Sequence, residues 1–305
     1  MRCTMGLKKD ESRLNAMLMG FVIGDAIGVP YEFTTRDTYD AKGMDGHGMW
    51  DQPKGTWSDD TSLTLCLVQN LLEDGTVDDL MKKFVKYRDE GYLTPYGECF
   101  DIGVTTDDAV NKYIRGYSVE DCGMTGLYSN GNGGVMRILP VVISELNSTQ
   151  TDRMASTKLY TKLTHAHDIS LTGSILFVEL LVSLLKGNIL ESSLHDLYSL
   201  ELPSIDEYRL LFNLPNLKRD DVKSTGYVVD SLIAAVHSVY STKTFSEAVL
   251  YAINLGGDTD TIGALTGALA GVIYGSDGLP SDWLGDIVRL GDLQTMFDTL
   301  ITKYQ

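Results

Sequence analysis

Two stretches with helical periodicity carry a small residue at every fourth position, and these rows constrain the fold more than any other feature. The rows consist of Ala16, Gly20, Gly24 and Gly28 in the first stretch and of Gly263, Gly267, Gly271 and Gly275 in the second. Glycine inside a helix costs roughly 1 kcal/mol relative to alanine, so such rows need a compensating interaction. Because an i,i+4 row of small residues forms a groove, the rows predict helices that pack closely against other backbone. That packing by itself implies no chemistry.

Helical patterns dominate the rest of the chain, and strand-like alternation is scarce. Thr76 is a predicted N-cap for a helix over 77–90 that ends at Gly91. Further helices are expected over 11–28, 62–72, 168–186, 245–254, 262–274 and 281–304. No linker or internal repeat divides the chain, and the polar segment 200–221 is expected to be a surface excursion. We therefore expect one compact, multi-helix, all-α domain over residues 1–305.

The balance of charges excludes some classes of partner. The chain has 25 Lys and Arg against 42 Asp and Glu, a net charge of −17. Such a surface repels phosphate backbones and anionic lipid, so no binding to nucleic-acid backbone or to membrane is expected. The charge is still compatible with a local pocket for one phosphorylated small molecule.

The cysteines and the N-terminus bear on the cellular compartment. The four cysteines, Cys3, Cys66, Cys99 and Cys122, form no CxxC motif and are expected to be reduced thiols. The N-terminus has no apolar segment of the secretory type. The longest apolar run, 175–185, is shorter than the roughly 20 residues that a membrane span needs. We expect a cytoplasmic protein of undetermined oligomeric state.

Two acidic clusters precede predicted helices: Ser-Asp-Asp-Thr at 58–61 and Gly-Gly-Asp-Thr-Asp-Thr at 256–261. Capping is the simplest explanation, since acids and hydroxyls suit a helix N-terminus. A cap needs one acceptor, however, and each cluster supplies two acids and hydroxyls. Six side-chain oxygens from two such loops would suit two Mg²⁺ ions. The acid pairs at 107–108 and 220–221 lack this context and are interpreted as structural.

Further candidate residues lie between the clusters. Glu32 follows Pro30 between two aromatic residues, a setting that can raise the pKa of a carboxyl group toward acid–base use. Asp25, seven residues earlier, is as well explained by bonds to loop amides. The loop 129–136 contains three glycines, so its N–H groups can converge on an anion. His165 either contacts a ligand or caps the helix that follows it.

These motifs, taken in order, resemble those of the ADP-ribosylglycohydrolases, the relatives of dinitrogenase reductase-activating glycohydrolase and crystallin J1. The blocks that carry the resemblance are 24–28 with Glu32, 58–61, 129–133, 164–165 and 256–261. The resemblance covers about residues 11–275 and implies an all-α fold with two Mg²⁺ or Mn²⁺ ions. It also implies that the substrate is an ADP-ribosylated protein, or a small ADP-ribosyl conjugate. The bond hydrolysed is the glycosidic bond between ADP-ribose and an acceptor, such as an arginine or serine side chain.

The resemblance also implies roles for individual residues. It assigns the two metal ions to Ser58, Asp59, Asp60, Asp258, Asp260 and Thr261. It places Glu32 near the scissile bond as the catalytic residue. It assigns substrate binding to Asp101, Ser129, Gly131, Asn132, Gly133, Gly134, Val135, Met136 and His165. Family members often have Thr in place of Ser58, which keeps the hydroxyl.

Two alternative functions remain open at this point. One is hydrolysis of a small-molecule ADP-ribosyl conjugate by the same ligands. The other is a catalytically silent ADP-ribose-binding or structural relative, which the complete set of acids argues against. The sequence does not determine the acceptor. It also leaves open whether Glu32 acts as a general acid, as a general base, or as a residue that supports the metal ligands.

Overall fold

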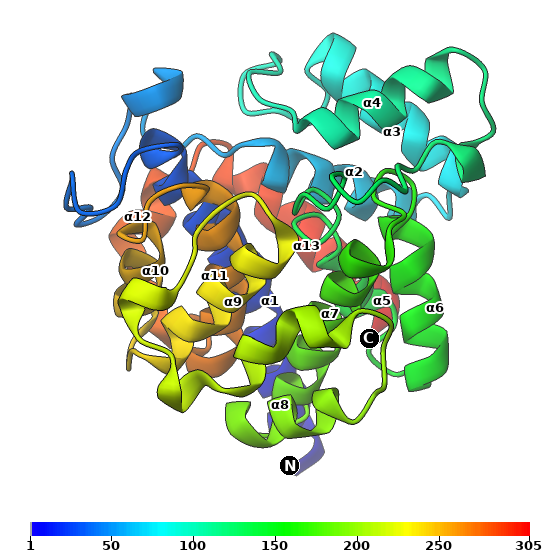
Figure 1. Cartoon of the computed structure of the whole chain (residues 1–305). Coiled ribbons are helices and arrows are strands. Elements are labelled where there is room, and N and C mark those ends of the chain that lie inside the picture. Colours follow the sequence, from blue (N-terminus) through cyan, green and yellow to red (C-terminus); the bar gives the residue numbers. More distant parts are fainter. Residues whose placement is uncertain (1) are drawn as a thin grey trace.

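The computed structural model describes the backbone of residues 2–305 and the side chains of residues 11–305, so the side chain of Cys3 lies outside the described part. The helices are α1 (Arg2–Gly28), α2 (Asp59–Leu72), α3 (Val77–Glu90), α4 (Val104–Ile114), α5 (Pro140–Ser144), α6 (Gln150–Thr161), α7 (Asp168–Leu185), α8 (Leu190–Tyr198), α9 (Val228–Tyr240), α10 (Phe245–Ile253), α11 (Thr259–Tyr274), α12 (Ser281–Asp286) and α13 (Leu290–Tyr304). Within residues 2–305 there are isolated β-bridges but no strand, as expected for an all-α domain (Figure 1).

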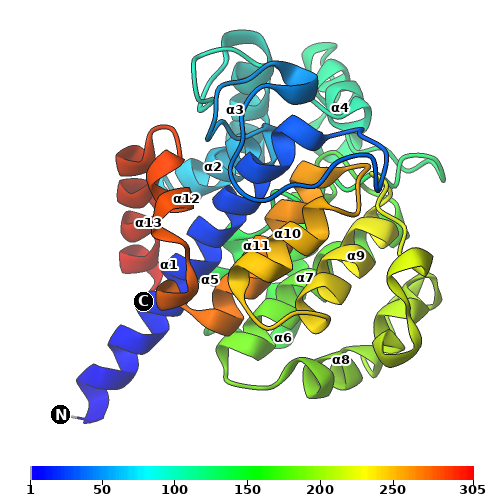
Figure 2. The same cartoon turned by 90° about the vertical axis from the view of Figure 1, so that its left-hand side faces the viewer.

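The two rows of small residues face each other along α1 and α11, which run antiparallel. A Cβ atom placed on Gly20 would lie 2.3 Å from the carbonyl oxygen of Gly267, and one on Gly24 would lie 1.9 Å from that of Gly263. Neither position has room for a side chain, so the predicted close packing is confirmed. Figure 2 shows α1 and α11 side by side, with α13 on the other side of α1.

The row on α11 ends at Gly271, one glycine earlier than expected. Gly275 has nothing within 4 Å of its Cβ position and does not face α1. It has a φ of 71° and forms the C-cap of α11, where glycine is favoured because it reaches positive φ without strain. At the opposite end of the pair, Gly28 packs against the backbone of Asp260, so the close contact extends to the acidic cluster.

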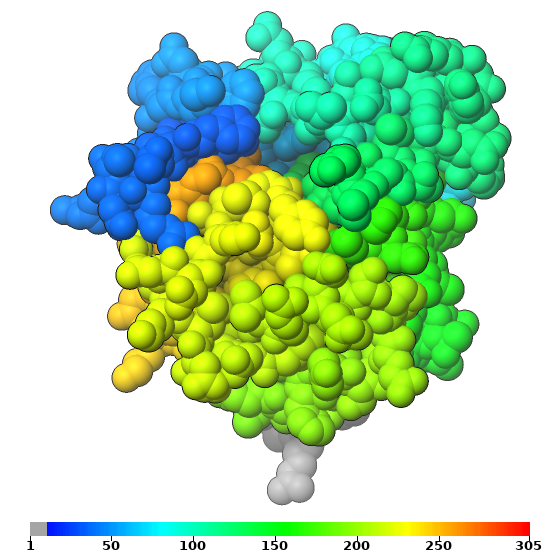
Figure 3. All heavy atoms as spheres, viewed as in Figure 1, coloured from blue at the N-terminus to red at the C-terminus, as the bar shows by residue number. Residues whose placement is uncertain are grey.

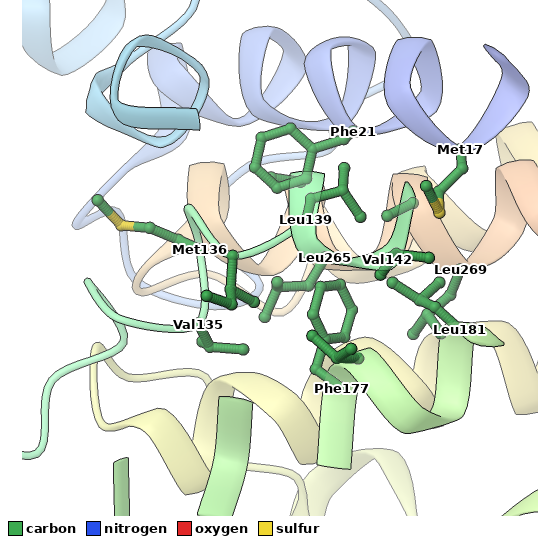
Figure 4. Packing of buried hydrophobic residues seen from close by; sticks show 14 of the residues in the cluster. Met17, Phe21, Val135, Met136, Leu139, Val142, Phe177, Leu181, Leu265 and Leu269 are labelled. Carbon is green, nitrogen blue, oxygen red and sulfur yellow. The ribbon is translucent and has the colours of Figure 1, made fainter. Parts of the chain in front are cut away.

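The core lies where α7 packs on the α1–α11 pair. Figure 4 shows Phe177 and Leu181 of α7 meeting Leu265 and Leu269 of α11. Phe21 of α1 packs in the same buried cluster. A helix that is buried on most of its sides needs apolar residues all round, and this explains the almost uncharged sequence of α7.

Most predicted helices are found, with differences at their ends. The helix at 77–90 is confirmed, and Thr76 and Asp79 form a capping box at its start. The expected helix over 281–304 is wrong: it is divided into α12 and α13, because Arg289 adopts a left-handed conformation with a φ of 54°. The segment 200–221 contains short 3-10 helices, and Tyr208 within it is fully buried.

Two helices are long and apolar enough to cross a membrane by length and composition alone. They cover residues 11–31 and Asp168–Leu185, and 89% and 78% of them are buried inside the fold. The second is longer than the apolar run 175–185 because it also includes residues 168–174, in which Asp168 is the one charged residue. Burial in the core accounts for the composition of both helices. Cys66 and Cys122 are buried free thiols, and Cys99 is half-buried.

Candidate metal and substrate site

Seven acidic side chains gather where the starts of α2 and α11 meet the end of α1. Five of them are almost fully buried: Asp25, Glu32, Asp59, Asp60 and Asp260. Asp101 and Asp258 are half-buried beside them. None of the seven takes part in an ion pair among residues 11–305, although that region contains many. Buried carboxylates without a cationic partner are costly, so this cluster needs another source of positive charge.

Ser58 caps α2 without help from the two acids that follow it. Its Oγ accepts a hydrogen bond from the N–H of Asp60 at 3.2 Å. Asp25 of α1 holds the same turn, because its carboxylate accepts bonds from the N–H groups of Ser58 and Thr61 and from the Thr61 hydroxyl at 2.6 Å. The expectation that Asp25 satisfies loop amides is therefore confirmed. The start of α2 is therefore capped by Ser58 and Asp25, and capping does not explain why Asp59 and Asp60 carry buried carboxylates.

The start of α11 is tied to the segment that carries Glu32. Phe33 N–H donates to the carbonyl oxygen of Gly257 at 2.7 Å, and Gly257 N–H donates to that of Thr34 at 3.0 Å. Gly257 has a φ of 77°, and a Cβ atom there would lie 2.0 Å from the carbonyl oxygen of Ser224. Glycine is required at this position, and it brings Asp258 and Asp260 to the same place as Glu32.

The geometry of the cluster fits a cation. Carboxylate oxygens of Glu32, Asp258 and Asp260 lie within 4.8 Å of one another. Asp60 has one buried carboxylate oxygen, Oδ1, that has no hydrogen-bond partner among the described atoms. The hydroxyls of Ser58 and Thr261 both contact its other oxygen, at 3.3 and 3.2 Å. Several convergent carboxylates with hydroxyls are the donor set that hard divalent cations prefer.

The electrostatics of the cluster agree with this geometry. Burial raises the pKa of Asp59, Asp60 and Asp260 well above the ordinary value, and the neighbouring carboxylates raise it further. Burial, with repulsion from Asp101, raises the pKa of Glu32 to about 8. Bound cations would relieve this mutual repulsion.

Glu32 also touches an aromatic wall that the sequence did not reveal. The indole N–H of Trp50 donates a hydrogen bond to Glu32 Oε2. Trp50 contacts Phe33 edge-on, with ring centroids 6.4 Å apart, and packs against Phe100 at 5.8 Å. Trp50 lies in the long irregular segment between α1 and α2, where hydrophobic periodicity gives no signal.

The acids open onto a cavity of about 430 Å³. Figure 3 shows a hollow on this face of the molecule, between the segments coloured blue, green and yellow. Five of the seven acids line the cavity, namely Glu32, Asp59, Asp101, Asp258 and Asp260, and Thr261 lines it beside them. Ser58 and Asp60 lie buried outside this lining. A cavity that carries several acids next to a candidate metal site is suited to a small charged ligand.

The glycine-rich loop contributes only part of its length to the cavity. Its lining residues are Gly131, Asn132, Gly133 and Met136, together with His165 from the next segment. Val135 is fully buried in the core, where Figure 4 places it near Phe177. Gly134 packs against Thr161 and His165, and Ser129 lies in a turn closed by Gly126. Ser129, Gly134 and Val135 therefore do not line the cavity: Ser129 lies in the preceding turn, and Gly134 and Val135 face the interior between Gly133 and Met136.

Buried polar groups hold this loop in place. Asn132 Nδ2 donates to Asp258 Oδ2 and to Ser231 Oγ, both at 2.9 Å. Arg137 is 1% exposed and donates to the carbonyl oxygen of Gly133. The loop and the acidic cluster are thus joined directly through Asn132. A buried arginine within an apolar turn carries no recognisable signal in the sequence.

His165 contacts the cavity and does not cap a helix. The N-cap of α7 is His167, whose side chain accepts from the N–H of Ile169. His165 is 1% exposed, its Nδ1 lies 2.7 Å from the hydroxyl of Thr164, and burial lowers its pKa to about 3. The ring is therefore neutral and lies over Gly131 and Gly133.

The acid pairs interpreted as structural lie outside the cavity lining. Asp107 accepts a hydrogen bond from Arg88 at 3.1 Å, and Asp220 is exposed. The residue before Asp107 differs from both pairs: Thr106 is fully buried and lines the cavity, and no motif in the sequence marks it.

Comparison with known proteins agrees with this architecture. The family model described as ADP-ribosylglycohydrolase matches residues 7–305, so the similarity extends beyond Gly275. The chain is 32% identical to ADP-ribosylarginine hydrolase Tri1 of Serratia proteamaculans, over 98% of this chain and 81% of that protein. It is 28% identical to the ADP-ribosyl-dinitrogen reductase glycohydrolase of Rhodospirillum rubrum, over 91% and 90% of the two chains.

A solved structure gives the same result for the fold. A chain titled "ADP-ribosylglycohydrolase-related protein complex" superposes with a TM-score of 0.85 at 26% identity, covering 98% of this chain and all of that chain. Fold, acidic cluster and sequence similarity over the whole length point to one conclusion. The chain belongs to the ADP-ribosylglycohydrolase family.

Proposed function

We propose that this chain hydrolyses the glycosidic bond between ADP-ribose and an arginine side chain of a protein, and that it uses two Mg²⁺ or Mn²⁺ ions. The observation that carries the proposal is the cluster of seven acids, which has no ion-pair partner among residues 11–305 and opens onto the cavity lined in part by the glycine-rich loop. The choice of arginine is supported by the relative at 32% identity, which is named an ADP-ribosylarginine hydrolase.

The two cations would be held by Ser58, Asp59, Asp60, Asp258, Asp260 and Thr261. These residues fit the ions because they converge from two helix starts and include the unpartnered Oδ1 of Asp60. When bound, such ions lower the pKa of water and hold sugar hydroxyls. Asn132 fixes the orientation of Asp258 through its side-chain amide.

Glu32 is placed to move a proton at the scissile bond. A glycosidic bond breaks through an oxocarbenium-like state, and a carboxyl group near neutral pKa can donate or accept a proton there. Burial supplies the raised pKa, and the Trp50 indole fixes one carboxylate oxygen. Phe33 and Trp50 line the cavity beside Glu32 and provide aromatic faces on which a guanidinium group can stack.

The diphosphate of ADP-ribose would lie along the glycine-rich loop. Gly131 and Gly133 let the ligand approach the backbone closely, and Asn132 and Arg137 keep the loop rigid. A catalytically silent role is disfavoured because every acid of the cluster is present.

The test is release of ADP-ribose from defined substrates. The protein is incubated with one peptide that carries ADP-ribose on arginine and a matched peptide that carries it on serine. We expect free ADP-ribose from the arginine-linked peptide at a higher kcat/KM. Release only from the serine-linked peptide would overturn the choice of acceptor, and release from neither would overturn the proposed activity.

A further inference from the structure

The first turn of α4 forms one wall of the cavity, although none of the sequence motifs considered for the site includes it. Gly103, Val104, Thr105 and Thr106 all line the cavity. Within this turn Thr106 is fully buried, and its hydroxyl oxygen has no hydrogen-bond partner among the described atoms. Buried hydroxyls are normally bonded, because desolvation without a partner costs free energy.

The surroundings of Thr106 indicate where a partner would lie. A Cβ atom on Gly133 would be 3.0 Å from Thr106 Oγ1 and 3.3 Å from His165 Nε2. The three residues therefore enclose one point of the cavity, next to the backbone of the glycine-rich loop. The other ring nitrogen of His165 already contacts Thr164 at 2.7 Å, which leaves Nε2 for the cavity.

We propose that the Thr106 hydroxyl donates a hydrogen bond to a diphosphate oxygen of ADP-ribose bound beside Gly133, and is thus a substrate-binding residue of this enzyme. The inference rests on the proposed function, because it takes ADP-ribose as the ligand. The positive end of α4 favours a negatively charged oxygen at this place. The hydroxyl has no partner among the described atoms of the free protein because its partner is the ligand.

This assignment predicts opposite effects of one substitution on binding and on stability. Thr106→Val keeps the shape of the side chain and removes the hydroxyl. A lost hydrogen bond to a charged oxygen weakens binding by about tenfold or more. Replacing an unpartnered buried hydroxyl with a methyl group is neutral or stabilising for the free protein.

Thr161 provides a matched control. It is also a fully buried threonine whose hydroxyl has no partner among the described atoms, but it does not line the cavity. Thr161→Val should therefore leave ADP-ribose affinity unchanged. Thr106→Ser retains the hydroxyl and should keep most of the affinity.

The experiment measures ADP-ribose binding to the four proteins by calorimetry with Mg²⁺ present, and their melting temperatures without ligand. We expect Thr106→Val alone to lose about tenfold in affinity, with an unchanged or higher melting temperature. Wild-type affinity in Thr106→Val, or an equal loss in Thr161→Val, would overturn the inference. If the wild-type protein itself fails to bind ADP-ribose, the proposed function fails instead.

Discussion

Gly24 of α1 and Gly263 of α11 lie so close that a methyl group on Gly24 would be 1.9 Å from the carbonyl oxygen of Gly263. Asp25 follows Gly24 directly and holds the turn that carries Asp59 and Asp60. The close approach of the two helices therefore sets the separation of the two acidic clusters. Packing and site geometry depend on the same contact.

Gly24→Ala should destabilise the protein strongly. The added Cβ meets backbone, which cannot rotate away, so the loss in free energy of unfolding should reach roughly 1–3 kcal/mol or more. Gly291→Ala in α13 is the control, because nothing lies within 4 Å of its Cβ position, and alanine there should be neutral or stabilising. Denaturant unfolding measures both. Equal stability of the two variants would contradict the packing described for α1 and α11.

The metal-free protein should lose stability as the pH rises from 5.5 to 8. The folded-state pKa of Glu32 is about 8 and those of Asp25 and Asp101 are about 6, all above the ordinary values of 4.5 and 3.8. In this range the folded state keeps protons that the unfolded chain has released, so the free energy of unfolding falls with increasing pH.

Melting curves with chelator present test this dependence. The melting temperature should be lower at pH 8 than at pH 5.5, and excess Mg²⁺ should restore most of the difference at pH 8, because the ions bind only the folded cluster. A metal-free protein that melts higher at pH 8 would show that the acids are not mutually repelling.

Much of this organisation was accessible from the sequence, for physical reasons that can be named. The helix at 77–90 was predicted to the residue because Thr76 and Gly91 mark its ends chemically. The motifs at 58–61 and 256–261 stand out in the sequence as candidate cation sites, because a helix cap needs one acceptor and each motif offers several.

Other features depend on tertiary contacts that leave no local signal. The break between α12 and α13 covers residues 287–289, which include neither glycine nor proline, although Gly285 and Gly291 lie just inside the two helices. Trp50 reaches Glu32 from an irregular loop, and Arg137 reaches Gly133 from within the core. The burial of Val135, which keeps it out of the cavity, likewise comes from its packing in the core near Phe177 of α7.

Glu32→Gln should separate catalysis from binding. Glutamine keeps the shape and can still accept the indole hydrogen bond of Trp50, but it cannot transfer a proton. We expect kcat to fall by roughly 10²–10⁴, the usual contribution of acid–base catalysis, with ADP-ribose affinity little changed. If Mn²⁺ affinity falls instead, with kcat nearly normal at saturating metal, Glu32 supports the metal site and does not transfer a proton.

Asp258→Asn should reduce Mn²⁺ binding. The substitution removes an anionic metal ligand from the cluster. The loss of Mn²⁺ affinity should therefore exceed the roughly 10–100-fold that follows when a residue hydrogen-bonded to a metal ligand is removed. Asp107→Asn is the matched control, because Asp107 bonds to Arg88 outside the cavity. Mn²⁺ titration followed by electron paramagnetic resonance compares the two. Similar losses in both variants would mean that the clusters have been assigned incorrectly.

We propose that the acids at the starts of α2 and α11 hold cations that the hydrolysis requires. The most direct measurement is the rate of ADP-ribose release from an arginine-linked ADP-ribosyl peptide by chelated protein, followed by titration with Mg²⁺ or Mn²⁺. We predict no release after chelation and full recovery with about two ions bound per chain. An undiminished rate in excess chelator would contradict this proposal.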